Sequence, residues 1–221
     1  MGTDDLFKRR RAERKARVHE TRSLRPGSFL IVTEGEKTEP AYFRGLTKTL
    51  EKQTGSKVDI HTEGEGCHTV PLVERAAQIA SKAGRHFEQV WVVFDKDDFT
   101  DFDEAIKLAN SYNYQVAWSN QAFEFWLFLH FDYSDAALHR KDWADKLDAI
   151  FKERGIRASG YKKNLDNLYE LVTKHGDEAL AIKSARSLHK RFQDQGLKPS
   201  QSNPCTTVYQ LVESIKGELD S

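Results

Sequence analysis

The chain has 221 residues, of which 38% are hydrophobic and 31% are charged, and its formal net charge is zero. This length allows one large domain, or one domain with an insertion. No apolar run approaches the ~20 residues of a membrane span, and no apolar stretch near the N-terminus resembles a secretory signal. The two cysteines, Cys67 and Cys205, form no zinc-binding pattern. We therefore expect a cytoplasmic protein with reduced thiols and no membrane association.

Residues 1–25 differ in charge from the rest of the chain. They contain nine Lys or Arg against four Asp or Glu, which gives this segment a charge of +5 and leaves −5 for the other 196 residues. With so few apolar residues the segment cannot bury a face, so we expect a solvated, partly helical basic arm. The alternative is an arm that binds nucleic-acid phosphates or a partner protein.

Residues 26–132 alternate between strand and helix patterns. Apolar runs predict strands at residues 29–33, 58–62, 89–94 and 114–118. Helical spacing of apolar residues predicts helices at 39–50, 71–83, 102–111 and 123–131, with Thr38 capping the first helix and Ser119 or Asn120 the last. This order predicts an α/β fold with a mainly parallel sheet flanked by helices.

Residues 133–221 form the helical C-terminal part of the chain. We expect helices at residues 143–154, 165–175, 178–195 and 206–218, joined by turns that contain Gly or Pro. These residues include too few apolar side chains to build a separate core, so they should pack on the α/β core. The predicted division is therefore a basic arm at 1–25, a core at 26–132 and a helical extension at 133–221.

Acidic residues follow two of the expected strands. Glu34 follows the first strand, and Asp95 and Asp97 follow the third. In open parallel sheets ligands bind beyond the carboxyl ends of the strands, and clustered carboxylates repel unless a cation lies between them. Oxygen ligands suit Mg²⁺ or Mn²⁺, which favours phosphoryl or phosphodiester chemistry. The plainer alternative is a solvated strand end, or the single acidic pocket of a response-regulator-like fold.

Four further residues, Glu39, Glu124, Lys162 and Lys163, bear on the acidic site, and each has more than one interpretation. Glu39, near a helix N-terminus, either offsets the helix dipole or binds a metal. Glu124 lies among aromatic residues, where an unpaired carboxylate is costly, so it must face water, a cation or a basic partner. Lys162 and Lys163 belong either to a solvated turn, or to a turn that contacts phosphates without catalysis, or one of them supplies a positive charge to catalysis. His130, on the same helix as Glu124, is interpreted as a hydrogen-bonded core residue.

The acidic pattern resembles a known family. A first-strand Glu followed by an Asp-x-Asp pair on a later strand is typical of the Toprim fold of topoisomerases, primases and OLD-type nucleases. More closely, four stretches resemble the RloB-like proteins. They are Thr33-Glu34-Gly35-Glu36-Lys37-Thr38-Glu39-Pro40, Val92-Val93-Phe94-Asp95-Lys96-Asp97-Asp98, the segment 118–131 and Tyr161-Lys162-Lys163-Asn164. With a fifth motif at 203–212, the resemblance covers residues 28–213.

The resemblance implies a Toprim-type nuclease of bacterial antiphage defence, often encoded with an AAA or ABC-type ATPase. It implies a set of metal ligands and a lysine that assists catalysis: Glu34, Glu39, Asp95, Asp97 and Glu124, with Lys162 or Lys163. The second acid follows Glu34 by five residues, one more than in the OLD-type pattern, so Glu36 competes with Glu39 for that role.

Three functional classes remain open from the sequence. The first is a Mg²⁺- or Mn²⁺-dependent nuclease that uses a two-metal mechanism on RNA, including transfer RNA, or on DNA. The second is another phosphoryl enzyme that acts on nucleotides, for example a nucleotide hydrolase or a primase-like polymerase. The third is a non-catalytic adaptor that retains a Toprim shell and docks onto a defence ATPase. The sequence leaves the polymer, the trigger and the formation of a homo-oligomer undecided.

Overall fold

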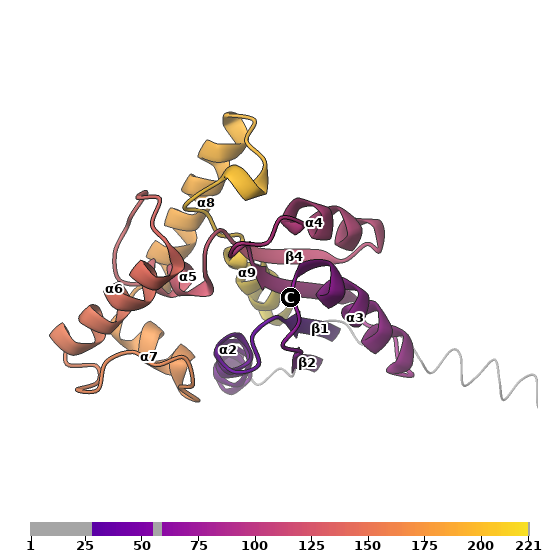
Figure 1. Cartoon of the computed structure of the whole chain (residues 1–221). Helices are drawn as coiled ribbons and strands as arrows, with labels where there is room; N and C mark the ends of the chain where they lie inside the picture. The colour runs from indigo at the N-terminus through magenta and orange to yellow at the C-terminus, as the bar shows by residue number, and fades with distance from the viewer. Residues whose placement is uncertain (1–27, 55–58, 221) are drawn as a thin grey trace, which may run out of the picture.

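The computed structural model describes residues 28–54 and 59–220 (Figure 1), so the predicted basic arm at 1–25 lies outside the described residues. Its centre is a four-stranded sheet of β1 (Ser28–Thr33), β2 (Asp59–Gly64), β3 (Gln89–Asp95) and β4 (Gln115–Ser119). The strand order is β2-β1-β3-β4 and all pairings are parallel. The predicted α/β fold with a parallel sheet flanked by helices is confirmed.

Both faces of the sheet are buried. Along β1, Phe29 and Ile31 join one cluster of buried side chains, and Leu30 and Val32 join a second cluster on the opposite face. This alternation follows from the period of two in a strand. A strand that buries both faces must be apolar throughout, which explains the continuous apolar runs in the sequence.

Two pairs of helices cover the two faces. Helices α3 (Thr69–Lys82) and α4 (Phe102–Ser111) pack on one face, while α2 (Thr38–Thr54) and α9 (Val208–Asp220) pack on the other. The connection from β1 to β2 and the connection from β2 to β3 therefore run on opposite faces. The chain passes from β1 outwards to β2 and then back across β1 to β3. A crevice opens at such a reversal of strand order, between β1 and β3.

Helix α5 (Phe123–Phe128), from the predicted core, lies beside three helices of the helical extension. It gathers with α6 (Arg140–Glu153), α7 (Leu168–His175) and α8 (Glu178–Asp194) on one side of the sheet (Figure 1). A short 3₁₀ turn, η1 (Pro199–Gln201), precedes α9. None of the helices in the described ranges is long and apolar enough to cross a membrane.

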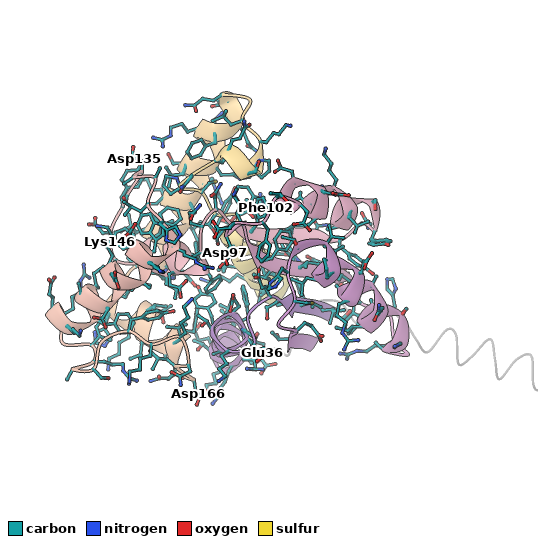
Figure 2. The ribbon with its side chains drawn as sticks, viewed as in Figure 1. Glu36, Asp97, Phe102, Asp135, Lys146 and Asp166 are labelled. Atoms are coloured by element: carbon teal, nitrogen blue, oxygen red, sulfur yellow. The ribbon has the colours of Figure 1, made fainter. Side chains whose placement is uncertain are left out.

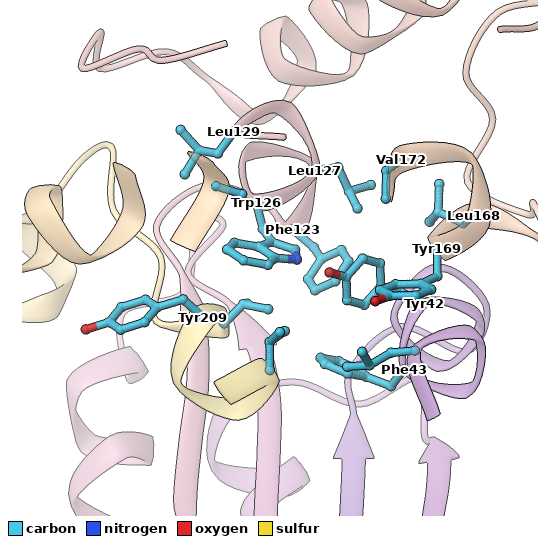
Figure 3. Close-up of a cluster of buried hydrophobic side chains, with 14 of the residues drawn as sticks. Tyr42, Phe43, Phe123, Trp126, Leu127, Leu129, Leu168, Tyr169, Val172 and Tyr209 are labelled. Carbon is cyan, nitrogen blue, oxygen red and sulfur yellow. The ribbon is translucent and has the colours of Figure 1, made fainter. Parts of the chain in front are cut away.

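One apolar cluster joins the extension to the α/β core (Figure 3). Tyr42 of α2 makes edge-to-face contacts with Phe123 of α5 and Tyr169 of α7, with ring centroids 5.6 and 5.2 Å apart. Such pairs add to the free energy of burial. Through Tyr169, the helical extension thus packs on the aromatic side chains of the core. The domain boundary at 132/133 stays a prediction.

Several predicted helix boundaries and caps are wrong. Helix α5 ends at Phe128 rather than 131, because the chain tightens into a turn in which the N–H of Phe131 bonds to the carbonyl of Phe128. Helix α6 starts three residues earlier than predicted, at Arg140, because the side chain of His139 caps it. Ser119 and Asn120 do not cap α5: Asn120 donates instead to carbonyl groups of η1, at Pro199 and Ser200.

The interpretation of His130 as a core residue is confirmed. Its Nδ1 lies 3.1 Å from the carbonyl oxygen of Trp126, and its Nε2 lies 3.4 Å from the hydroxyl of Tyr42. Burial lowers the pKa of His130 to about 4, so the ring is neutral at physiological pH.

Candidate active site

The crevice between β1 and β3 holds a cavity of about 410 Å³. Its walls come from the loops and helix ends at the carboxyl ends of the strands. Figure 2 shows Asp97 at this position, between the α/β part and the helical extension. The cavity is lined by charged, glycine and aromatic residues: Glu34, Gly35, Glu36, Lys37, Thr38, Glu39, Gly66, His68, Asp95, Asp97, Phe123, Glu124 and Lys163. All five predicted metal ligands therefore line a single cavity.

Glu34 and Asp95 lie on adjoining strands and are joined by a hydrogen bond. The backbone N–H of Asp95 donates to Oε2 of Glu34 at 3.2 Å. The other oxygen, Oε1, lies 3.1 Å from Nδ1 of His68. Because a carboxylate only accepts hydrogen bonds, His68 donates here from Nδ1. Burial raises the pKa of Glu34, although the bonds from His68 and Asp95 oppose that shift.

Asp95 ends β3 and lies among the other acids of the cavity. Its pKa is raised well above the usual range by burial first, and then by the nearby charges of Glu39, Glu124 and Glu34. Its Oδ2 accepts a hydrogen bond from the backbone N–H of Phe123 at 2.9 Å. The first turn of α5, which carries Glu124, is therefore fixed to the end of β3.

Glu39 is buried in the first turn of α2 and packs against Gly35. A Cβ atom at Gly35 would lie 2.1 Å from Oε2 of Glu39, so only glycine leaves room for this carboxylate. Burial, followed by repulsion from Glu124 and Glu34, raises the pKa of Glu39 to about 7. Glu36 also lines the cavity but is exposed, so the buried second acid is Glu39.

Glu124 is 2% exposed and has two partners from the loop between α6 and α7. The hydroxyl of Tyr161 donates to its Oε1 at 3.1 Å, and Nζ of Lys163 lies 3.0 Å from the same oxygen. Thr38 fixes this loop because its hydroxyl donates to the carbonyl of Lys163 at 2.6 Å. The expectation that Glu124 faces a cation or basic partner is met by Lys163. Lys162 is exposed and does not line the cavity.

Asp97 lies at the rim of the cavity, on a strained piece of backbone. Its φ of 41° falls in the left-handed region, which non-glycine residues seldom adopt. Its Oδ2 accepts a hydrogen bond from Nη1 of Arg140, at the start of α6, at 2.5 Å. Burial raises the pKa of Asp97, and Arg140 opposes the shift.

Comparison with protein families gives a match to this chain. The family model described as RloB-like protein matches residues 29–215, which run from β1 into α9 and include every carboxylate named above. The chain belongs to the RloB-like family. No curated protein and no solved structure matches it.

Three residues of the RloB-like site escaped the sequence analysis. Arg140 pairs with Asp97 from a helix that was predicted to start after it. His68 bonds to Glu34 from a loop whose only signal was the glycine-rich segment before it. Tyr161 belonged to a quoted motif, but nothing in the sequence indicated that its hydroxyl reaches Glu124 across 37 residues.

Three of the five proposed ligands in the RloB-like cavity, Glu34, Asp97 and Glu124, contact basic groups. Lys163, Arg140 and His68 each contact a different carboxylate. Within residues 28–54 and 59–220, no group of three or more His, Cys, Asp or Glu side chains could hold a metal ion as it stands. The donors match Mg²⁺ or Mn²⁺ in kind, since all are carboxylates around one cavity. An entering ion would compete with Lys163 for Glu124 and with Arg140 for Asp97.

Proposed function

We propose that this RloB-like chain is a metal-dependent phosphodiesterase that cleaves RNA or DNA. One observation carries the proposal: Glu34, Glu39, Asp95 and Glu124 line one cavity in the crevice between β1 and β3. Besides burial, the charges of Glu124 and Glu34 raise the pKa of Glu39, and the charges of Glu39, Glu124 and Glu34 raise the pKa of Asp95. Repulsion among these carboxylates lowers the stability of the metal-free fold. A divalent cation would turn the same repulsion into binding energy.

The proposed ligands of Mg²⁺ or Mn²⁺ are the five acids that line the cavity: Glu34, Glu39, Asp95, Asp97 and Glu124. The chemistry that two such ions would supply here is activation of a water molecule and stabilisation of the leaving oxygen of an in-line displacement. The chain's own residues orient these acids. The N–H of Phe123 holds Asp95, and the hydroxyl of Tyr161 holds Glu124.

Lys163 rather than Lys162 is the proposed catalytic lysine. Its ammonium group already lies at the carboxylates, and the charges of Glu124, Asp95 and Glu39 hold its pKa above the usual value although burial opposes this. It is thus a permanent cation at neutral pH. A cation in this position can stabilise the negative charge that develops on a phosphoryl group during displacement.

A non-catalytic adaptor is the second candidate, and one observation favours it. Lys163 and Arg140 form ion pairs with two of the acids, Glu124 and Asp97, so part of the acidic charge is compensated without a metal. The cavity, at about 410 Å³, also has the size of a small-molecule site, which keeps a nucleotide-hydrolysing enzyme as the third candidate.

Cleavage assays separate the three candidates. The full chain, alone and with any co-encoded ATPase, is incubated in Mn²⁺ with labelled plasmid, total RNA and free nucleotides. The nuclease predicts cleaved polymer that disappears in Asp95→Asn but persists in Asp98→Asn, an exposed acid on the same loop. Turnover of nucleotides alone supports the third candidate. Lack of both Mn²⁺ binding and turnover supports the adaptor.

The biological setting follows from family resemblance and is part of the proposal. We propose that the protein acts in the cytoplasm in bacterial antiphage defence, with an AAA or ABC-type ATPase as partner, and that it binds nucleic acid as substrate. Phage plating on cells that carry the wild-type locus or the Asp95→Asn variant tests this. Equal plating efficiency would remove the defence role, and co-purification tests the ATPase partner.

A further inference from the structure

One wall of the carboxylate cavity is aromatic and open to solvent. His68 lines the cavity, and the ring of Phe99 stacks behind it with centroids 4.4 Å apart and planes inclined by 24°. The side chain of His68 is 53% exposed. Phe123, which also lines the cavity, belongs instead to the buried core. The stacked pair His68–Phe99 therefore presents a ring to the cavity that packing of the core does not require.

The pair is held by a bond between two loops. His68 follows β2 and Phe99 follows β3, and the hydroxyl of Thr69 donates to Oδ2 of Asp101 at 2.8 Å. Thr69 has a φ of 38°, which a β-branched residue adopts only under strain. Strain of this kind persists where the surrounding structure over-determines it and is common at functional sites. The strained link lies next to the residue that forms the aromatic wall.

The aromatic pair lies beside the reacting groups and beside cations. Nδ1 of His68 is 3.1 Å from Glu34. Arg140 contacts Asp97, two residues before Phe99, and Lys163 lines the same cavity. A nucleic acid presents this combination: phosphates for the cations and, one sugar away, a flat base for a ring. Within a duplex both faces of a base are covered by neighbouring bases, so a ring at the phosphate can stack only on an unstacked base.

We propose that His68, backed by Phe99, is a stacking shelf for an unpaired base next to the phosphodiester that is cleaved. The substrate class is then single-stranded or locally unpaired nucleic acid rather than continuous duplex. This inference rests on the proposed nuclease function, and it adds a positioning role for two residues outside the carboxylate set.

The test compares strands of equal charge with and without bases. Fluorescein-labelled single strands of mixed sequence, as DNA and as RNA, a matching duplex and an abasic DNA strand are titrated with the full chain. Ca²⁺ replaces Mg²⁺, and a gel checks that the strands stay intact. The basic arm contributes equally to the affinities for the DNA strand and for the abasic strand, because both carry the same phosphates, so its contribution cancels in the comparison. Stacking of one base predicts about 5- to 150-fold tighter binding of the base-bearing single strand.

Two substitutions at His68 separate stacking from support of Glu34. His68→Asn keeps a donor near the position of Nδ1 but removes the ring, and His68→Phe keeps the ring but removes the donor. The shelf predicts that His68→Asn and Phe99→Leu lose most of the preference for bases, while His68→Phe retains it. Tyr112→Ala is the control, because Tyr112 is 45% exposed and lies at the opposite, amino-terminal edge of the sheet.

The possible results distinguish the shelf from the nuclease. If His68→Phe loses the base preference and His68→Asn retains it, the ring only supports Glu34 and the shelf is overturned. A wild-type chain that cleaves polymer but binds abasic and base-bearing strands equally overturns the shelf alone. A wild-type chain that binds no strand and cleaves none overturns the proposed function, and the shelf with it.

Discussion

Lys163 places its ammonium nitrogen 3.0 Å from Oε1 of Glu124, and it does so from a side chain that is 70% exposed towards one that is almost fully buried. The charge of the buried Glu124 is therefore compensated by Lys163, whose exposed side chain is free to move away from it. Removing one partner of a buried pair costs several kcal/mol, and exposure of the other partner reduces that cost. This relationship makes Glu124 both a reporter of metal binding and a weak point of the metal-free fold.

Lys163→Met should destabilise the metal-free protein by about 1–2 kcal/mol, because it leaves the Glu124 carboxylate buried with only the Tyr161 hydroxyl as partner. Saturating Mn²⁺ should restore the lost stability while cleavage stays impaired. Chemical denaturation with and without Mn²⁺ measures both effects. Lys162→Met is the matched control and should change neither. Equal behaviour of the two variants would contradict the assignment of Lys163.

Glu124→Gln should leave the protein folded, because the amide oxygen can still accept from Tyr161. It should weaken binding at one metal and reduce turnover at least tenfold, which corresponds to ~1.4 kcal/mol. Isothermal titration with Mn²⁺ and a cleavage time course measure the two quantities. Normal turnover in this variant would remove Glu124 from the ligand set.

Asp95→Asn should raise the melting temperature in metal-free buffer, because it removes a charge that Glu39, Glu124 and Glu34 repel. Its side-chain oxygen can still accept from the N–H of Phe123. The same variant should lose the stabilisation that Mn²⁺ gives the wild type. Differential scanning fluorimetry measures both changes. A lower melting temperature with an unchanged Mn²⁺ response would refute the repulsion argument.

His130 should make the protein less stable in mild acid. Burial lowers its pKa from 6.5 to about 4, so between these values the unfolded chain binds a proton that the folded chain does not. The contribution of His130 is fully present above pH 6.5 and is lost as the pH falls to 4, by up to about 3 kcal/mol. Denaturation midpoints from pH 7 to 4 should therefore fall less steeply in His130→Gln. The same change at His86, which is exposed, should leave the slope as in the wild type.

Deletion of residues 1–24 should leave the fold intact, because β1 begins at Ser28 and the described core is built from residues after it. If the arm binds phosphates, the full-length chain should lose affinity for nucleic acid steeply with added salt and the truncated chain less steeply. Binding isotherms at several salt concentrations give the two slopes. Equal salt slopes for the two chains would mean that the arm binds a protein partner or has no partner.

Local patterns account for most of the fold. The sequence predicted β1, β3, α3 and α4 with errors of at most two residues. Continuous apolar runs mark the two strands, and the helical spacing of apolar residues marks the two helices, so both signals can be read from residue order alone. Larger errors, of three residues each, lie at the end of α5 and at the starts of α6 and α7. At α6 a histidine cap, which is not among the common capping residues, decided the start.

The candidate site also contains residues that the sequence predicts and residues that only the fold brings together. The sequence alone determined the carboxylates, since Glu34, Asp95 and Asp97 end apolar strands and Glu124 carries a charge among aromatic residues. Only the tertiary structure shows that Lys163 rather than Lys162 contacts Glu124, and that Glu39 is buried at the cavity while Glu36 is exposed. It alone brought Arg140 to Asp97 and stacked His68 on Phe99. Neighbouring residues look alike in a sequence, but the direction of each side chain depends on loops fixed by distant contacts, such as the bond from Thr38 to the carbonyl of Lys163.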